Sequence, residues 1–91
     1  MTNISRQEWL EVFSALASDS RLEIVRMISK RKMTCQDIID RLELSQPAIS
    51  YHLAKLERAG ILTKKRVGSH NCYWLNERLV KLIDMLNEED Q

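Results

Sequence analysis

Apolar side chains recur every three or four residues along most of this chain, which is the spacing of amphipathic helices. The first such run follows Ser5 and Glu8, which are spaced as a capping box at a helix start. We therefore predict a first helix that ends near Ala17. Its apolar face consists of Trp9, Leu10, Phe13, Leu16 and Ala17.

Three further helices are predicted before Gly60. The second starts within residues 18–20, is apolar on most sides and ends at the three cations of residues 30–32, which suit the negative end of a helix dipole. The third starts at Thr34, with Asp37 three residues later, and carries Ile38, Ile39 and Leu42. Ser45 is a good N-cap for the fourth helix, which tolerates Pro47 in its first turn and buries Ile49, Leu53 and Leu56.

Two β-prone runs, residues 61–67 and 70–75, flank Gly68-Ser69 and predict a hairpin with cations near its tip. Asn76 is placed to cap a last helix with apolar positions at Leu79, Leu82, Ile83 and Leu86, and residues 87–91 are expected to fray. Only two Gly and one Pro are present, which argues against a many-stranded sandwich or barrel. The expected fold is mainly α with a small β-hairpin wing: a winged helix-turn-helix of five helices.

With 91 residues, the chain has the length of one domain, so we expect residues 1–91 to form a single unit. The formal net charge of +1 conceals an uneven distribution. Residues 45–76 carry five cations against Glu57 alone, whereas residues 77–91 carry two cations against five carboxylates. The basic middle third favours a polyanionic partner. The chain lacks a membrane span and a secretory leader, so a cytoplasmic location is the expectation.

The predicted fourth helix combines with the cationic hairpin into a surface suited to double-stranded DNA. Its outward side is small and polar, and the major groove admits a helix whose first turns carry such side chains. Gln46 is the best candidate base reader because its amide suits adenine, followed by Ser50 and Tyr51. The full predicted DNA-binding set is Ser45, Gln46, Pro47, Ser50, Tyr51, Lys55, Lys64, Lys65, Arg66, Ser69 and His70. The alternative is a winged helix that binds another protein and never meets DNA.

The first and last helices each carry an apolar stripe that the three central helices and the hairpin cover only in part. A twofold interface between two copies would cover the rest. The predicted interface residues are Trp9, Leu10, Phe13, Leu79, Leu82, Ile83 and Leu86. The competing interpretation is that these stripes close the monomer's own core. A dimer would read a palindromic operator with half-sites about one helical turn apart.

Several segments of the chain closely resemble the ArsR/SmtB family of bacterial and archaeal repressors. They are Ala-Leu-Ala-Ser-Asp-Ser-Arg-Leu at residues 15–22, Ser-Gln-Pro-Ala-Ile-Ser-Tyr-His-Leu at 45–53, Ala-Gly-Ile-Leu at 59–62 and Cys-Tyr-Trp-Leu at 72–75. The resemblance covers roughly residues 9–86. It implies a homodimer, paired through the first and last helices, that occupies an operator and leaves it when an effector arrives. The sequence does not identify that effector.

The chain departs from the family's metal-sensing members, which commonly carry Cys-x-Cys-Asp at the start of the third helix. Thr34 and Gln36 stand at those cysteine positions, and Cys35 lies between them. We therefore predict no metal site and no cofactor, and we read His52 as a structural residue. No catalytic motif is visible, so an enzyme is not expected.

Thiol chemistry is a further alternative. In this fold a short strand near Met33 usually pairs with the second hairpin strand, which would bring Cys35 toward Cys72 and permit a redox-sensitive disulfide. Buried inert thiols are the simpler interpretation. Ser69 is another departure, because an Arg or Lys often follows the wing glycine in relatives.

Overall fold

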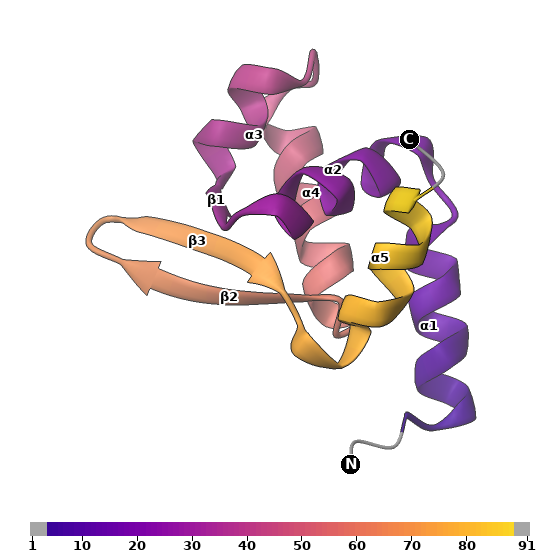
Figure 1. Cartoon of the computed structure of the whole chain (residues 1–91). Helices are drawn as coiled ribbons and strands as arrows, with labels where there is room; N and C mark the ends of the chain where they lie inside the picture. The colour runs from indigo at the N-terminus through magenta and orange to yellow at the C-terminus, as the bar shows by residue number, and fades with distance from the viewer. Residues whose placement is uncertain (1–3, 89–91) are drawn as a thin grey trace.

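The computed structural model describes residues 4–88 and has five α-helices, one short 3-10 helix and three strands in that range. The order along the chain is α1 (Arg6–Leu16), α2 (Asp19–Lys30), β1 (Met33–Thr34), α3 (Cys35–Arg41), α4 (Gln46–Arg58), β2 (Leu62–Val67), β3 (His70–Leu75), η1 (Glu77–Leu79) and α5 (Val80–Glu88). The hairpin of β2 and β3 projects from the helical body, and α1 and α5 lie together on the opposite side (Figure 1). This arrangement confirms the predicted winged helix-turn-helix.

Local capping sets the helix starts as the sequence predicts. The Ser5 hydroxyl accepts from the Glu8 N–H at 3.1 Å, and the Glu8 carboxylate accepts from the Ser5 N–H at 3.0 Å. Thr34 and Asp37 form the same reciprocal box at the start of α3. Among the candidate starts for α2, the chain uses Ser18 as the N-cap.

The core lies among the five α-helices and the inner face of the sheet, which α2, α3 and α4 contact directly. Ile49, Leu53 and Leu56 are buried as predicted, and they fix α4 on this core. Leu62 and Tyr73 close the core from the side of the sheet. Because these three aliphatic residues of α4 lie on one side of the helix, the polar side of α4 is left at the surface.

The last helix differs from the sequence prediction. Asn76 is the cap, as expected, but it starts the short helix η1, and α5 begins only at Val80. Leu79 and Ile83 are each 1 % exposed and belong to the monomer core, which corrects their assignment to the dimer interface. Two positions predicted to fray, 87 and 88, are helical, and the rest of that segment lies outside the described residues.

The three strands form one antiparallel sheet in the order β1-β3-β2. Met33 pairs with Tyr73 and Thr34 with Cys72, as expected for a short strand beside the hairpin. Val67 pairs with His70 across a two-residue turn, and Gly68 in that turn has a positive φ of 63°. Glycine suits this first turn position because side chains disfavour the left-handed region. Within residues 4–88 no helix is long and apolar enough to cross a membrane.

Candidate nucleic-acid interface

The proposed recognition helix, α4, starts at the N-cap Ser45 and presents an outward side that we call its polar front, with Gln46, Ser50 and Tyr51. The Ser45 hydroxyl accepts from the Ala48 N–H at 3.3 Å, and Pro47 occupies the first turn, where a missing N–H has no cost. Gln46, Ser50 and Tyr51 are all exposed. The opposite side of α4 packs against the core, so these three side chains project into solvent.

Tyr51 is the largest side chain on this front and is 56 % exposed. The Lys55 ammonium lies 5.7 Å from the centre of its ring, and the His52 ring meets it edge to face at 5.6 Å. The cation over one ring and the ring at its edge restrict where the phenol points. Tyr51 is therefore presented to solvent in a restrained orientation.

His52 is connected to the helical body through Arg21. The guanidinium Nη1 lies 3.1 Å from His52 Nδ1, and Arg21 Nε donates to the Ala15 carbonyl at 2.6 Å. Burial lowers the pKa of His52, and the Arg21 charge lowers this pKa further. A neutral ring accepts from the guanidinium, which supports the structural role predicted for His52. Sequence reasoning missed Arg21 as its partner, because the two residues lie 31 positions apart.

The cations of the wing do not all face one way. Neighbouring strand residues point to opposite faces of a sheet, so Lys64 and Arg66 share the core-facing side and Lys65 the other. Lys64 also forms an ion pair with Glu57 of α4 at 3.6 Å. The Lys-Lys-Arg run is thus divided, and its first cation is partly neutralised. Arg66, Ser69 and His70 are exposed toward the tip, as the DNA-binding prediction requires.

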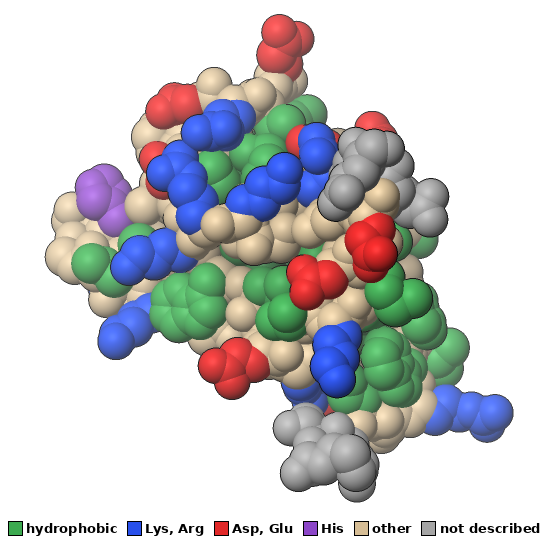
Figure 2. All heavy atoms as spheres, in the orientation of Figure 1, with side chains coloured by type: hydrophobic (Ala, Val, Ile, Leu, Met, Phe, Trp, Pro, Cys, Tyr) green, Lys and Arg blue, Asp and Glu red, His purple; other side chains and the backbone are tan. Residues whose placement is uncertain are grey.

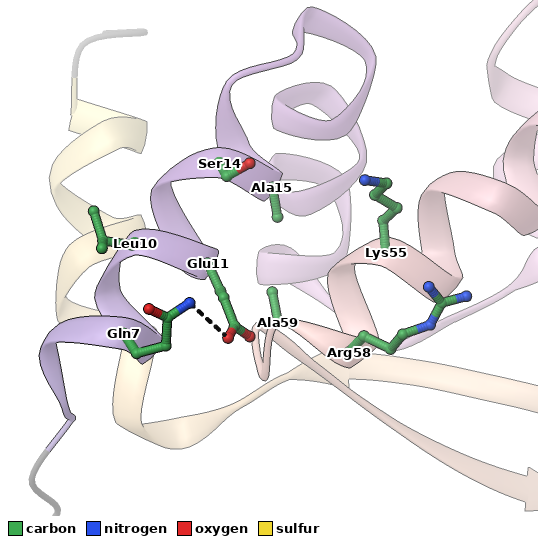
Figure 3. Close-up of a pocket in the computed structure, with 8 residues that line it drawn as sticks. All are labelled: Gln7, Leu10, Glu11, Ser14, Ala15, Lys55, Arg58 and Ala59. Carbon is green, nitrogen blue, oxygen red and sulfur yellow. Dashed lines mark hydrogen bonds between the residues drawn. The ribbon is translucent and has the colours of Figure 1, made fainter.

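The outer face of the wing carries a cavity of about 400 Å³ lined by Lys32, Lys65, Val67, Cys72 and Trp74. A second cavity, of about 340 Å³, lies between α1 and the C-terminal half of α4, where Lys55 and Arg58 are among its lining residues. Figure 3 shows Gln7 and Glu11 of α1 on the other wall, joined by a hydrogen bond of 3.4 Å. Cations of α4 thus continue around its side toward α1.

Both cysteines are free thiols. Cys35 Sγ lies 4.0 Å from the Ser50 hydroxyl. Cys35 packs against the core, on the side of the sheet where Tyr73 is buried. Burial raises the pKa of the Tyr73 phenol, and Cys35 contributes to the same shift. Cys72 precedes Tyr73 in β3 and faces the outer cavity instead. The strand pairing brings the two cysteines into neighbouring segments, but their side chains lie on opposite faces of the sheet.

Apolar residues are exposed on α1 and α5, as Figure 2 shows along that side of the molecule. Leu10 is 57 % and Phe13 55 % exposed, and Trp9 stacks on Phe13 with 5.5 Å between ring centres. Leu86 is exposed and Leu82 is half-buried. Met85, at 64 % exposed, also belongs to this face, although the sequence analysis did not select it. Among residues 4–88, no three His, Cys, Asp or Glu side chains are grouped to hold a metal ion.

Comparison with known proteins identifies the family. The model of the bacterial regulatory protein ArsR family matches residues 18–64, the segment from the cap of α2 into β2. The arsenical resistance operon repressor of Bacillus subtilis is 36% identical over 91% of this chain and 78% of its own length. The chain belongs to the ArsR family.

Solved structures show the same fold for this ArsR-family regulator. HlyU from Vibrio cholerae superposes with a TM-score of 0.84 and 29% identity, covering 90% of each chain. A possible ArsR-family regulator of Mycobacterium bovis, described as a homodimeric winged helix-turn-helix DNA-binding domain, gives a TM-score of 0.84 at 20% identity. That comparison covers 99% of this chain and 90% of the other. The protein is therefore a winged helix-turn-helix transcriptional regulator.

Proposed function

We propose that this chain is a homodimeric, sequence-specific repressor that acts on a palindromic operator in the cytoplasm, without a metal cofactor. The observation that carries the proposal is the exposed polar front of α4 beside the exposed cations of the wing. In this proposal Gln46, Ser50 and Tyr51 read base edges, with Ser45 and Pro47 at the groove. Phosphate contacts come from the cations and the tip: Lys55, Lys64, Lys65, Arg66, Ser69 and His70.

The charge arrangement supports this division of roles. Phosphate contacts fix a protein on the duplex and carry no sequence information, whereas amide and hydroxyl side chains discriminate base edges. The α4 front has short polar groups and no carboxylate in its first turn. Glu57 at the C-terminal end of α4 is paired with Lys64, which leaves Lys65 and Arg66 as the stronger phosphate ligands of the wing.

The exposed residues of α1 and α5 support the dimer. Leu10, Phe13 and Met85 are each more than half exposed, and a second copy would remove them from water. The Mycobacterium bovis regulator with the same fold is a homodimer. The amended interface consists of Trp9, Leu10, Phe13, Leu82, Met85 and Leu86. Repression is proposed because two Bacillus subtilis relatives, the arsenical resistance operon repressor and SdpR, are repressors. HlyU of Vibrio cholerae, at 34% identity, is a transcriptional activator, and activation is the alternative.

The test is a fluorescence-anisotropy titration of the full chain against DNA from upstream of its own gene, repeated over a range of salt. If each subunit neutralises about four phosphates, log Kd changes with log salt with a slope of about 7. Gln46→Ala should relax base preference, with one operator position losing about 1–3 kcal/mol of discrimination.

Lys65→Ala is the matched control because it removes a phosphate contact and no base contact. It should weaken binding to operator and scrambled DNA alike and should lower the salt slope by about 1. Binding that does not respond to salt would contradict the proposal. An equal loss of specificity from both substitutions would contradict the assigned roles.

A further inference from the structure

A cavity of about 530 Å³ opens between α2 and the C-terminal end of α3, away from the polar front of α4. Its walls carry four cations and its floor is apolar. Figure 2 shows Lys and Arg side chains gathered around hydrophobic atoms over these helices. The lining residues are Glu23, Arg26, Met27, Lys30, Arg31, Met33, Arg41 and Leu42.

The carboxylate that lines this cavity, Glu23, already has a partner, and so does the nearby Asp37. Glu23 pairs with Arg26 at 3.4 Å. Asp37 accepts from the Thr34 N–H at 2.9 Å, and hydrogen bonds from Thr34 lower its pKa, with Arg31 and Arg41 adding to the effect. Lys30, Arg31 and Arg41 are exposed at the rim. Helix dipoles favour cations at the ends of α2 and α3, but four cations and one carboxylate are among the residues that line the cavity, so its rim suits an anion.

The floor of the cavity is apolar, so a ligand that fills the cavity needs an apolar part as well as a negative charge. Met33 is buried and Met27 and Leu42 are half-buried, so two thioether side chains and a leucine line the bottom. Methionine side chains adapt to irregular apolar ligands. The volume lies within the range of small-molecule sites, which is about 300–1,000 Å³. An inorganic anion would leave this floor uncovered, and a neutral apolar molecule would leave the cations without a partner.

We propose that this cavity binds a small organic anion with an apolar body, of the class of a medium-chain or aryl carboxylate. The carboxylate lies at the rim with Arg31 and Arg41, and the apolar body covers Met27, Met33 and Leu42. The further claim that this ligand regulates DNA binding rests on the proposed function. Its basis is that α3, one wall of the cavity, packs directly against α4.

The experiment uses the full chain labelled with ¹³C at the methionine methyl groups and titrated with decanoate. We expect the Met27 and Met33 signals to move in a saturable manner while the Met85 signal stays in place. Decanol, which has the same chain length without the charge, should bind at least about tenfold more weakly. No movement at Met27 and Met33, or movement at Met85 instead, overturns the site.

Matched variants test the charges. Arg31→Gln with Arg41→Gln should raise the Kd for decanoate about tenfold, because two charge contacts at the exposed rim are lost. Arg6→Gln with Lys81→Gln removes two exposed cations elsewhere and should leave this Kd unchanged. Equal Kd values for the two double variants would contradict the assigned anion contacts. If removal of residues 88–91 moves the Met27 and Met33 signals and decanoate moves neither in the full chain, the occupant is the acidic tail.

The regulatory claim has a separate measurement. Decanoate at saturation should weaken operator binding of the unmodified chain, and the Arg31→Gln, Arg41→Gln variant should need about tenfold more decanoate for the same loss of operator affinity. Unchanged operator affinity with decanoate bound would refute regulation and leave the binding site intact. A chain that does not bind DNA would refute the proposed function, while the methionine titration would still decide the site.

Discussion

Gly60, where α4 turns into the sheet, has a close neighbour from a distant part of the chain. Its φ is 79°, and a Cβ built on it would lie 2.6 Å from Nη2 of Arg78. The Arg78 guanidinium is only 23% exposed and pairs with Glu8 of α1 at 3.3 Å. Gly60→Ala should therefore destabilise the protein for two reasons, the strained backbone and the displaced arginine.

Gly68 separates these two effects. Its φ of 63° is also in the left-handed region that disfavours alanine, but nothing lies within 4 Å of its added Cβ. Gly68→Ala should cost about 1 kcal/mol, the cost of a left-handed backbone alone. Gly60→Ala should cost about 2 kcal/mol, because moving the guanidinium out of its rotamer adds about 0.5–1.5 kcal/mol.

The assay is urea unfolding followed by far-ultraviolet circular dichroism, at one fixed protein concentration because a dimer's stability depends on it. Thermal scans give a second reading, since each kcal/mol lowers the Tm of a domain of this size by roughly 4–8 °C. The same two glycine substitutions are then made in an Arg78→Met variant, which lacks the guanidinium that would clash with the added Cβ. In that background Gly60→Ala should cost no more than Gly68→Ala.

Two results would refute the reasoning. If the two glycine variants lose the same free energy of unfolding in the unmodified chain, the Arg78 guanidinium moves aside at no energetic cost. An undiminished Gly60→Ala loss in the Arg78→Met background would mean that the strain comes from some other contact. Double-mutant cycles of this kind isolate the pairwise effect.

The remaining predictions concern α4, its histidine and the dimer face. His52 has a lowered pKa in the folded state, so the folded protein should lose stability as the pH falls below about 6.5, where the unfolded imidazole gains a proton more readily. Urea unfolding of His52→Gln should show a flatter pH dependence between about pH 7 and 5, and an equally steep profile would rule out this histidine as the cause. Phe13→Glu should raise the dimer Kd by at least about tenfold in sedimentation velocity, whereas Gln36→Glu on α3 should not; identical Kd values would remove Phe13 from the interface. Ser45→Ala should cost about 1 kcal/mol in unfolding and weaken operator binding more than non-specific binding; unaltered stability would show that the cap is dispensable.

Features determined by a few neighbouring residues were predictable from the sequence. The capping box of Ser5 and Glu8 formed as predicted, because both partners lie within one helical turn. The hairpin register follows from Gly68 in the same way. The alternation of strand side chains that places Lys65 and Arg66 on opposite faces could also have been predicted from the sequence. The sequence prediction instead treated Lys64, Lys65 and Arg66 as one group because they are consecutive.

Long-range packing was not predictable from local patterns. The apolar spacing of the last helix fits either a dimer face or a core. Which of its residues turn inward depends on the short helix η1 that precedes α5. Leu79 and Ile83 pack inside, while Met85 and Leu86 are left outside. The contact of Arg78 with Gly60 depends on the path of the chain through the whole wing, so no spacing rule indicates it.

Arg21 touches two elements with different roles in the proposed dimer. Its guanidinium donates to one carbonyl in the last turn of α1, that of Ala15, and contacts His52 in the middle of α4. In a dimer built through α1, Arg21 therefore helps to set the separation of the two α4 helices, together with the direct packing of α1 on α4. Shortening it, as in Arg21→Gln, should change the preferred number of base pairs between half-sites while leaving the preferred half-site sequence unaltered. Selection from a DNA library with variable spacers would measure this change, and an unchanged spacer preference would show that other contacts set the span.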